Sequence, residues 1–445
     1  MSLAATAPGL ISAKEGYRRV ATIFNETGTL EAYLAFEGAL AAVQGELGII
    51  PPEAAQRIQT VCSKEALDLP ALRRDAARVG YPIVPLVNQL AACAGSMGQW
   101  VHFGATTQDV MDTALALQIQ QAGKVTLRDV KALERALSTL ADRNRTTMMI
   151  GRSKLQHAVP ISFGYKVAVW LDQLIRRRRA LAGAIDAASV VEFGGATGTL
   201  ASLQQEGIKV RAALAQRLNL TEPDISWHVL RDRQADLVYA HAALAAALAK
   251  MAIDIAHMMS SEVYELREPA EEGRGSSSTM PQKRNPVLCE AIIEAAREVR
   301  ELPSRSLDAM LQDHERAIGH GYSERRAVAF AMKETAGSVS LALELVEGLE
   351  VDESRMLSNI DGSNGLVYAE TAMLYLGKEL GRLEAHHVLS NLCNVALRKN
   401  IHLTQAIKEA GFAVPDDVFD PKSCLGGQLD MIDRVIDKVH HSEVG

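Results

Sequence analysis

The chain lacks most of the features that mark membrane, nucleic-acid-binding and secreted proteins. Only 4% of its 445 residues are aromatic, and no run approaches the roughly 18 uninterrupted apolar residues of a membrane-spanning helix. The net charge is -7, which argues against a nucleic-acid partner and against binding to an anionic membrane surface. Basic residues that bind anions must therefore be concentrated locally.

Cysteine is also scarce. The chain has 5 cysteines, an odd number, and none of them forms a Cys-x-x-Cys pair. This pattern argues against a disulfide framework and a zinc site, and it favours a reducing cytosol. Residues 1–9 lack the basic region and apolar core of a signal peptide. We therefore expect a cytoplasmic protein without a metal or another cofactor.

Alternating strand patterns are rare, whereas apolar residues recur at helical spacing almost throughout. Residues 224–268 contain neither glycine nor proline, and their apolar side chains step by three or four, which predicts a helix of about 40 residues. Similar segments, one of them interrupted at Gly123, cover residues 107–147, 163–182, 287–302 and 324–349. Long helices rich in Ala and Leu usually pack in bundles, often across subunits, so we expect an all-α chain.

The segments before and after these long helices are shorter and more broken. Gly48, Pro70 and Gly80 interrupt the first part, and residues 352–364 are polar and turn-rich. We therefore predict three helical domains: an N-terminal domain over residues 1–108, a central long-helix bundle over residues 109–351 and a small C-terminal domain over residues 352–445.

One polar loop, residues 273–286, stands apart from this Ala- and Leu-rich chain. It reads Gly-Arg-Gly-Ser-Ser-Ser-Thr-Met-Pro-Gln-Lys-Arg-Asn-Pro, and its glycines and prolines prevent a continuous helix. Ser- and Gly-rich stretches are often linkers, but a linker has no need of the Met-Pro-x-Lys-x-Asn-Pro after the serines. These side chains can take a proton beside a carboxylate and hold the resulting charge. We expect a loop that moves and orders.

Two further polar segments lead into long helices. In residues 101–113, Thr106 and Thr107 occupy the position of a helix cap, where exposed backbone N–H groups favour an anion. A plain N-cap is the alternative for this segment. In residues 151–160, His157 is a candidate catalytic residue. Lone histidines, however, are more often packing or surface residues.

Residues 193–200 are rich in glycine and suggest a phosphate-binding loop at first sight. No strand precedes them, and the lysine of a Walker motif is absent. We therefore interpret this segment as a close contact between helices or as a turn beside the substrate.

Charged residues form runs that are usually solvated helix faces. Within these runs Arg233 and Arg316 are our candidates for binding a substrate. His314 and Glu315 lack the second histidine of a metalloprotease motif, so they imply no metal. The runs cover residues 227–233, 313–316 and 320–326.

Taken together, these segments resemble the fumarate lyase (fumarase/aspartase) superfamily over nearly the whole chain. Residues 277–286 match its signature, Ser-Ser-x-Met-Pro-x-Lys-x-Asn-Pro, at every specified position. Residues 102–109 look like its first shared region, with Thr107 where serine is usual, and residues 151–160 look like its second. The resemblance implies a three-domain helical subunit and a homotetramer around a bundle of long helices. Each active site would take the three regions from three subunits.

The resemblance also implies the reaction and the residue roles. The shared step removes a proton from the carbon beside a carboxylate, and a group then leaves the next carbon. Ser277 would be the general base, with Ser278 as the alternative, and Lys283 would help to stabilise the serine oxyanion. The substrate carboxylates would be held by Lys283, Asn285, Thr106, Thr107 and Gln156.

The chain departs from many members at their histidines. Those that expel an amine or water carry Thr-His where this chain has Ser153 and Lys154, and residues 80–87 stand in place of a second histidine. Those residues, with Trp227 and His228, look like the 3-carboxy-cis,cis-muconate cycloisomerase branch. A carboxylate leaving group needs no proton, so the missing histidine fits a cycloisomerase. Lys154 then binds a third carboxylate or, if desolvated, acts as an acid.

Three functions stay open at this point. The first is a cycloisomerase acting on a small di- or tricarboxylate. The second is a C–N lyase, similar to adenylosuccinate lyase, that releases fumarate from an N-substituted aspartate. The region of Arg316 looks closer to that branch, but Gly321 and Tyr322 replace its phosphate-binding serines. The third is a non-catalytic helical scaffold. We expect neither a nucleic acid nor a membrane as a partner.

Overall fold

The structure is a computed structural model that describes residues 7–441. Residues 1–6, part of the stretch assessed for a signal peptide, lie outside this range. The regular secondary structure of the described chain is helical apart from two short two-stranded sheets, so the all-α prediction is confirmed. It divides into two compact units. The first consists of Met1–Asp129, Arg177–Ala246 and Glu294–Ser340, and the second of Val130–Arg176, Ala247–Ile293 and Leu341–Gly445.

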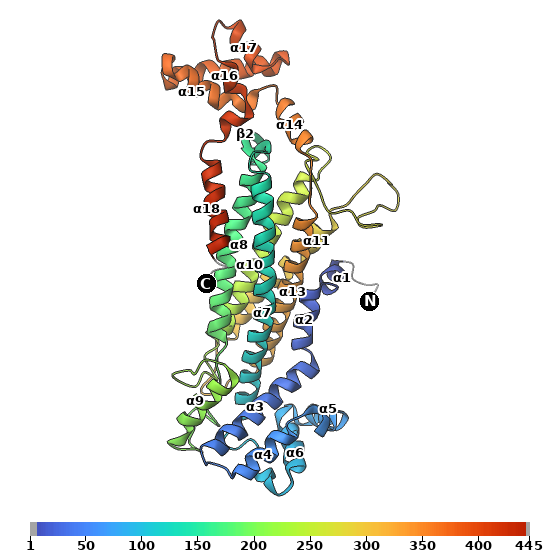
Figure 1. The fold of residues 1–445 in the computed structure, drawn as a ribbon, viewed down its shortest axis with the longest axis vertical. Helices are drawn as coiled ribbons and strands as arrows, with labels where there is room; N and C mark the ends of the chain where they lie inside the picture. Colours follow the sequence, from blue (N-terminus) through green and yellow to red (C-terminus); the bar gives the residue numbers. More distant parts are fainter. Residues whose placement is uncertain (1–6, 442–445) are drawn as a thin grey trace. The chain divides into compact units, whose positions relative to one another are not determined.

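Five long helices contribute to both units or lie at their boundaries, and they are drawn in Figure 1. They are α7 (Thr107–Arg143), α8 (Phe163–Ala188), α10 (Asp232–Met258), α11 (Val287–Arg300) and α13 (His320–Glu347). The first unit adds α1 (Ala7–Ser12), α2 (Glu15–Ile23), α3 (Glu26–Glu46), α4 (Pro52–Val61), α5 (Leu69–Val79), α6 (Ile83–Ala94), α9 (Glu206–Leu218), α12 (Leu302–Asp308) and the 3-10 helices η1 (Lys64–Ala66) and η2 (Gly95–Trp100).

The second unit contains the strands and the C-terminal helices. Its strands are β1 (Met148–Ser153), β2 (Gln156–Ser162), β3 (Leu266–Arg267) and β4 (Glu350–Val351). Its helices are α14 (Glu353–Asp361), η3 (Leu366–Tyr368), α15 (Ala369–Leu380), α16 (Arg382–Lys399), α17 (Leu403–Glu409), η4 (Asp416–Phe419), η5 (Pro421–Cys424) and α18 (Gln428–His441).

The core of the first unit anchors the N-terminal end of α7. α3 begins after Asn25, whose side chain accepts a hydrogen bond of 2.8 Å from the backbone N–H of Gly28. α4 and α9 pack against α3 (Figure 1). Phe36 of α3, Leu86 of α6 and Val110 of α7 belong to one buried hydrophobic cluster. α3 and α6 therefore hold the start of α7 in place.

α7 runs without a break through Gly123, where the sequence suggested an interruption. A Cβ atom at this position would lie 2.8 Å from Cδ1 of Ile185 on α8. The glycine thus lets the two helices approach closely, and α7 continues over 37 residues. The interpretation of Gly123 as a break is wrong.

The helix predicted over residues 224–268 is shorter than expected, because α10 covers only 27 residues. Before it, Trp227 is buried and its indole N–H donates to the carbonyl of Val191 at 2.9 Å. After it, Tyr264 has a φ of 51°, and a short strand begins at Leu266. The absence of glycine and proline permits a helix, but tertiary contacts decided where this one ends.

The second unit holds an antiparallel hairpin that the sequence did not predict. β1 and β2 pair from Met148 opposite Ser162 to Ser153 opposite Gln156. The polar residues 151–160 therefore form most of a hairpin, and the sequence pattern, which indicates only a polar lead into a helix, is wrong here. The C-terminal helices α15, α16 and α17 lie together (Figure 1) around a separate buried cluster. The three-domain division of the chain stays a prediction.

Candidate functional site

A cavity of about 440 Å³ in the first unit lies at the start of α7. It is lined by polar side chains and two tyrosines: Tyr81, Thr106, Thr107, Gln108, His228, Arg231, Gln312, Arg316, Tyr322 and Arg325, among others. Its charged side chains are three arginines, with the one imidazole of His228. Such a lining favours an anionic ligand.

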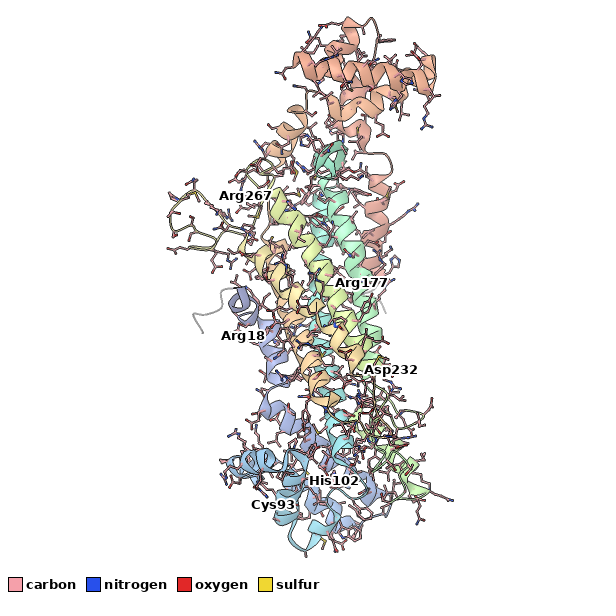
Figure 2. All side chains as sticks on the ribbon, turned by 180° about the vertical axis from the view of Figure 1, so that it is seen from behind. Arg18, Cys93, His102, Arg177, Asp232 and Arg267 are labelled. Atoms are coloured by element: carbon pink, nitrogen blue, oxygen red, sulfur yellow. The ribbon has the colours of Figure 1, made fainter. Side chains whose placement is uncertain are left out.

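The N-terminus of α7 forms one wall of this cavity. Thr106 precedes the helix, and its backbone N–H donates to Oδ2 of Asp109 at 2.9 Å, as in a capping box. The preceding turn contains His102, labelled in Figure 2, whose Nδ1 lies 2.6 Å from Oε1 of the buried Glu37. The first helical residue, Thr107, therefore follows a fixed turn and lines the cavity with its hydroxyl-bearing side chain.

The glycine-rich segment of residues 193–200 lies beside this helix end. The backbone N–H groups of Gly194 and Gly195 donate to the two oxygens of Asp109, both at 3.0 Å. Arg316 then joins the two elements. It donates to Oγ1 of Thr106 at 2.9 Å and to the carbonyls of Gly195 and Ala196 at 3.3 and 3.1 Å. The segment forms a turn next to the start of α7, and its place beside a substrate stays a prediction.

A buried cluster lies behind the helix end. Nε2 of His228 is 2.7 Å from Oδ1 of Asp109, and its Nδ1 is 3.1 Å from Oγ of Ser226. Glu192 accepts hydrogen bonds from that Ser226 hydroxyl at 2.8 Å and from the backbone N–H of Trp227. Both carboxylates have 0% exposed side chains, and His228 is 3% exposed.

Asp109, Glu192 and His228 place ligand atoms within 4.8 Å of one another, a donor set that could hold a metal ion. Every carboxylate oxygen of this set already accepts a hydrogen bond from the protein. The arrangement is complete without an ion. It therefore fits a hydrogen-bonded cluster better than a metal centre.

Burial sets the proton affinity of this cluster. It raises the pKa of Glu192 to about 7; the charge of His228 lowers that pKa, and the charge of Asp109 raises it. Burial alone would lower the pKa of His228, but the hydrogen bond to Asp109 and the charges of both carboxylates outweigh it and raise the pKa. The cluster thus gains or loses a proton near neutral pH.

A second buried network supports the floor of the cavity. Arg231 lies between Asp112, at 2.7 Å, and Glu324, whose oxygens lie 3.0 and 3.1 Å from its Nε. Arg325 donates to Asp112 at 2.6 Å. Burial would raise the pKa of Asp112, but the guanidinium groups of Arg231 and Arg325 hold it well below its usual range. Two arginines and two carboxylates balance each other here.

In the second unit, the hairpin of β1 and β2 exposes the predicted residues at its tip. Lys154 and Leu155 form the two-residue turn, with φ of 52° and 63°. This left-handed conformation suits a tight hairpin, and Asn or Gly usually adopts it. Lys and Leu adopt it here, so the backbone at the tip is strained. Lys154, Gln156 and His157 are exposed, and Leu155 is 85% exposed.

His157 also borders a second cavity, of about 300 Å³, within the second unit. Arg152 and Asn359 line it too, and both bond to the buried Glu265, with Arg152 at 2.6 and 2.9 Å and Asn359 at 2.8 Å. These bonds fix the base of the hairpin while its tip stays free.

The loop of residues 273–286 is also in the second unit. Its two candidate serines, Ser277 and Ser278, differ in hydrogen bonding and exposure. Oγ of Ser277 accepts the backbone N–H groups of Thr279 at 3.3 Å and Met280 at 3.1 Å. Ser278 and Lys283 have exposed side chains. Two amide donors on one hydroxyl oxygen favour its deprotonated form, so Ser277 has the better environment for a base.

The base of this loop is held more firmly than its tip. Asn285 bonds to the carbonyl of Gly275 through its backbone N–H at 2.8 Å and its side chain at 3.0 Å. Arg284 pairs with Glu350 at 3.0 Å and also donates to the carbonyl of Glu268. These contacts fix where the loop starts and ends. Among the described residues, 277–283 make no hydrogen bond or ion pair outside the loop.

The structure brings together part of the predicted set. Thr106, Thr107 and Arg316 line the cavity of the first unit, whereas Arg233 is half-buried on α10 and does not line it. The arginine that does so is Arg231, two positions earlier. The other predicted residues, all in the second unit, are Lys154, Gln156, His157, Ser277, Ser278, Lys283 and Asn285.

Sequence reasoning missed the buried members of the site. His228 and Arg231 lie in a run treated as a solvated helix face, because the helix was predicted to begin at residue 224. α10 begins at Asp232, so both residues precede it and point into protein. The signal that could have found His228 is the tryptophan beside it, since charged faces in solvent seldom include tryptophan.

Comparison with known proteins identifies the family of this chain. A family model described as lyase matches residues 17–300. A 3-carboxy-cis,cis-muconate cycloisomerase of Bradyrhizobium diazoefficiens is 36% identical, over 93% of this chain and 94% of that protein. A trans-aconitate decarboxylase of Mycosarcoma maydis is 36% identical, over 97% of this chain and 89% of that protein.

A solved structure agrees with these relatives. The crystal structure of a fumarate lyase from Mesorhizobium sp. BNC1 matches with a TM-score of 0.88 and 39% identity, over 94% of this chain and 97% of that chain. The signature loop, the long helices and the relatives thus concur over nearly the full length. The chain is an enzyme and belongs to the lyase family of the fumarate lyase superfamily.

Proposed function

We propose that this enzyme removes a proton from the carbon beside a carboxylate of a small di- or tricarboxylate, most like a 3-carboxy-cis,cis-muconate cycloisomerase. A β-elimination, or the reverse addition, follows. The observation that carries the proposal is the environment of Ser277. Its Oγ accepts two backbone N–H groups in the signature loop, six positions before the exposed Lys283. A serine needs such donors to act as a base.

The reaction starts at Ser277. Its Oγ takes the proton, and the C–H electron pair moves into the neighbouring carboxylate, which becomes an enediolate-like dianion. The bond from the next carbon to the leaving group then breaks, and a carbon–carbon double bond forms. Donors and cations that bind the dianion more tightly than the substrate lower the barrier. We assign this role to Lys283, Asn285, Gln156, Thr106 and Thr107.

The leaving group decides between branches. In a cycloisomerase it is a carboxylate oxygen, which departs without a proton, so no histidine is needed at Lys154. The exposed ammonium of Lys154, on its strained turn, then suits a third carboxylate. His157, three positions on, stays a catalytic candidate beside it.

A homotetramer with shared sites would join the two groups of residues. The exposed apolar side chains of α10 support such an assembly, since Tyr239 is 61% and Ile253 is 41% exposed. α10 is long and apolar enough to cross a membrane, but 67% of its apolar window is buried inside the structure. We propose a cytoplasmic enzyme without a metal or another cofactor, and with no nucleic-acid or membrane partner.

A C–N lyase acting on an N-substituted aspartate is the second candidate. The cavity of about 440 Å³ beside Thr106 favours it, because Arg316 and Arg325 also line that cavity. It leaves room for a bulky anionic substituent beyond the reacting carbons.

A non-catalytic scaffold would have no use for a serine bonded to two amides in an intact signature.

An ultraviolet assay tests both candidates. Purified enzyme is incubated with 3-carboxy-cis,cis-muconate and with a panel of N-substituted aspartates. We expect loss of the diene absorbance with the first and no fumarate from the panel. Fumarate release without diene loss would replace the cycloisomerase by the C–N lyase. No reaction with any compound would overturn both proposals.

Lys154→Met separates the two roles of that residue. A rise in KM of tenfold or more, roughly the loss of one ionic contact, with kcat kept would support carboxylate binding. A fall in kcat with KM kept would support an acid instead.

A further inference from the structure

The cavity at the start of α7 attracts an anion in front and carries buried negative charge behind. Thr106 and Thr107 present the helix N-terminus, and Arg316 adds a guanidinium. Directly behind them lie Asp109 and Glu192, both with fully buried side chains. An anion that enters the cavity therefore meets repulsion from two carboxylates, unless the cluster gains positive charge.

The charged groups that face this cluster come from α7 and from the segments next to α7, α8, α10 and α13. Asp109 is on α7, Glu192 follows α8, His228 precedes α10, and Arg316 precedes α13. Burial would lower the pKa of His102, in the turn before α7, but the charges of Glu37 and Asp109 raise it, and His102 pairs with Glu37 at 2.6 Å. The charge of Arg316 acts on His228 and lowers its pKa, whereas both carboxylates raise it. The arginines at the cavity floor are engaged elsewhere, with Asp112 and Glu324. The cluster must therefore balance its own charge.

Glu192 and His228 can do so because both are titratable, and the pKa of each is raised within the cluster. The pKa of Glu192 is raised to about 7 by burial, and the ring of His228 is the only imidazole that lines the cavity in the described chain. A hydrogen-bonded path through the Ser226 hydroxyl joins them, with steps of 2.8 and 3.1 Å. A proton taken up from solvent at either group lowers the negative charge behind the helix end.

We propose that His228 and Glu192 are positioning residues that take up one proton from solvent when an anion occupies the cavity, so that carboxylate binding is linked to pH. The inference rests on the proposed function, in which this cavity binds a substrate carboxylate. By reciprocity, an anion in the cavity raises the proton affinity of the cluster, and a protonated cluster binds the anion more tightly. Neither ring nitrogen of His228 is free to touch the substrate, since both have partners within the cluster.

The linkage predicts a measurable proton uptake. Calorimetric titration of the full-length enzyme with propane-1,2,3-tricarboxylate, a probe that does not react, is performed in two buffers of different ionisation enthalpy. Around pH 7 we expect a net uptake of about half a proton to one proton per site, and Kd rising up to about tenfold per pH unit above it.

Variants assign the uptake to the cluster. Glu192→Gln keeps an acceptor for the backbone N–H of Trp227 but cannot titrate, so we expect the uptake around pH 7 and the pH dependence of Kd to shrink to the part that His228 carries. His228→Gln removes the cation that lowers the pKa of Glu192, which moves the uptake to higher pH. Glu334→Gln is the matched control, because Glu334 is another buried carboxylate with its pKa raised to about 7 and it does not line the cavity. Its uptake should equal that of the wild type.

The outcomes separate this inference from the proposed reaction. Binding of the probe without proton uptake by the wild type would overturn the linkage and leave the reaction untouched. Proton-linked binding in an enzyme that turns over none of the candidate substrates would keep the linkage and overturn the reaction. No binding at all would overturn the anion-binding role of the cavity and the linkage with it. The wild-type measurement alone decides, even if a variant fails to fold.

Discussion

The start of α7 and the signature loop present their polar residues in opposite ways. Around Thr106 the polar groups are buried and have fixed partners. Asp109 accepts hydrogen bonds from three backbone N–H groups and contacts the ring of His228. Arg231 lies between two carboxylates. In the loop, the side chains of Ser278 and Lys283 are exposed. The polar groups at the start of α7 have their partners within the first unit, whereas the loop ends in exposed side chains.

Buried and exposed polar groups respond differently to substitution. A buried charge that loses its partner costs several kcal/mol, whereas an exposed side chain costs little to replace. Substitutions at the start of α7 should therefore affect stability and activity together. Substitutions at the loop tip should affect activity alone.

Ser277→Ala should reduce activity more than any other single change. We expect kcat to fall by about a thousandfold or more, because general-base catalysis typically contributes 10²–10⁴-fold and no other base replaces it. The melting temperature should stay unchanged, since the side chain bonds only within the loop tip. Steady-state kinetics and calorimetry measure both. Ser276→Ala, one position earlier, is the control and should keep activity within a few fold. Wild-type turnover in Ser277→Ala would refute the base assignment.

A mixture of two inactive variants tests whether the two regions meet across subunits. Ser277→Ala alters the loop, and Thr107→Val alters the cavity wall. If one site takes these residues from different chains, random mixed tetramers regain about a quarter of the wild-type sites. The assay is turnover after the two variants are unfolded and refolded together.

The control for this mixture is a pair from one loop, Ser277→Ala with Lys283→Met. It should regain nothing, because every chain then contributes a damaged loop. Equal recovery in both mixtures, or in neither, would contradict a site shared between the two regions.

Arg231→Met should be the most damaging change to the fold. Its side chain is 3% exposed and pairs with Asp112 and Glu324, which are 0% and 1% exposed. Leaving these carboxylates without it should cost about 3–5 kcal/mol, measured by denaturant unfolding. Arg297→Gln breaks an exposed pair with Glu294 and should cost less than about 1 kcal/mol. Similar losses in the two variants would contradict the contrast between buried and exposed polar groups.

The fold and half of the site could be predicted from the sequence because local patterns encode them. Helical periodicity identified α7, α8, α11 and α13, and the capping position of Thr106 agrees with a helix that begins at Thr107. The glycines, prolines and serines of the signature loop identified it in the sequence. Such features depend on neighbours within a few residues.

The rest depends on contacts that are distant in the sequence. Nothing local distinguishes Arg231, which is buried, from Arg233, which is not, until Asp112 and Glu324 are brought together around one of them. The hairpin at Lys154 was missed for the same reason, since its turn lacks the usual Asn or Gly. Tertiary packing, and not propensity, decided both cases.

Buried carboxylates also make stability depend on pH, and Glu334→Gln measures how much. Burial raises the pKa of Glu334 to about 7, with a further rise from the charge of Glu298. The folded state therefore binds more protons than the unfolded state between about pH 4.5 and about pH 7, so wild-type stability falls as pH rises through this window. The variant should equal the wild type at about pH 5 and exceed it by about 1–3 kcal/mol at about pH 8.

Thermal unfolding at the two pH values provides the test. Glu301→Gln, at an exposed position, should change neither value by more than about 0.5 kcal/mol. A gain at pH 5 as large as that at pH 8 would mean that ionisation of Glu334 is not the cause.

Two buried histidines differ in whether their ring nitrogens have hydrogen-bond partners. Both ring nitrogens of His228 have partners, whereas neither nitrogen of His241, fully buried on α10, has one in the described structure. His241→Leu should therefore raise the free energy of unfolding by about 1 kcal/mol, because an unsatisfied buried group is removed. His228→Leu should lower it by about 2 kcal/mol, because Asp109 and Ser226 lose their partner.

The sign of the pH dependence distinguishes this explanation from simple repacking. Burial lowers the pKa of His241 to about 3, so below about pH 6.5 the unfolded state binds a proton that the folded state does not. Wild-type stability therefore falls as the pH drops from about 6.5 toward 3, and the advantage of His241→Leu should grow over the same range. Denaturant unfolding at several pH values measures it. An advantage independent of pH would mean that better packing, and not the removal of an imidazole that cannot be protonated, stabilises the variant.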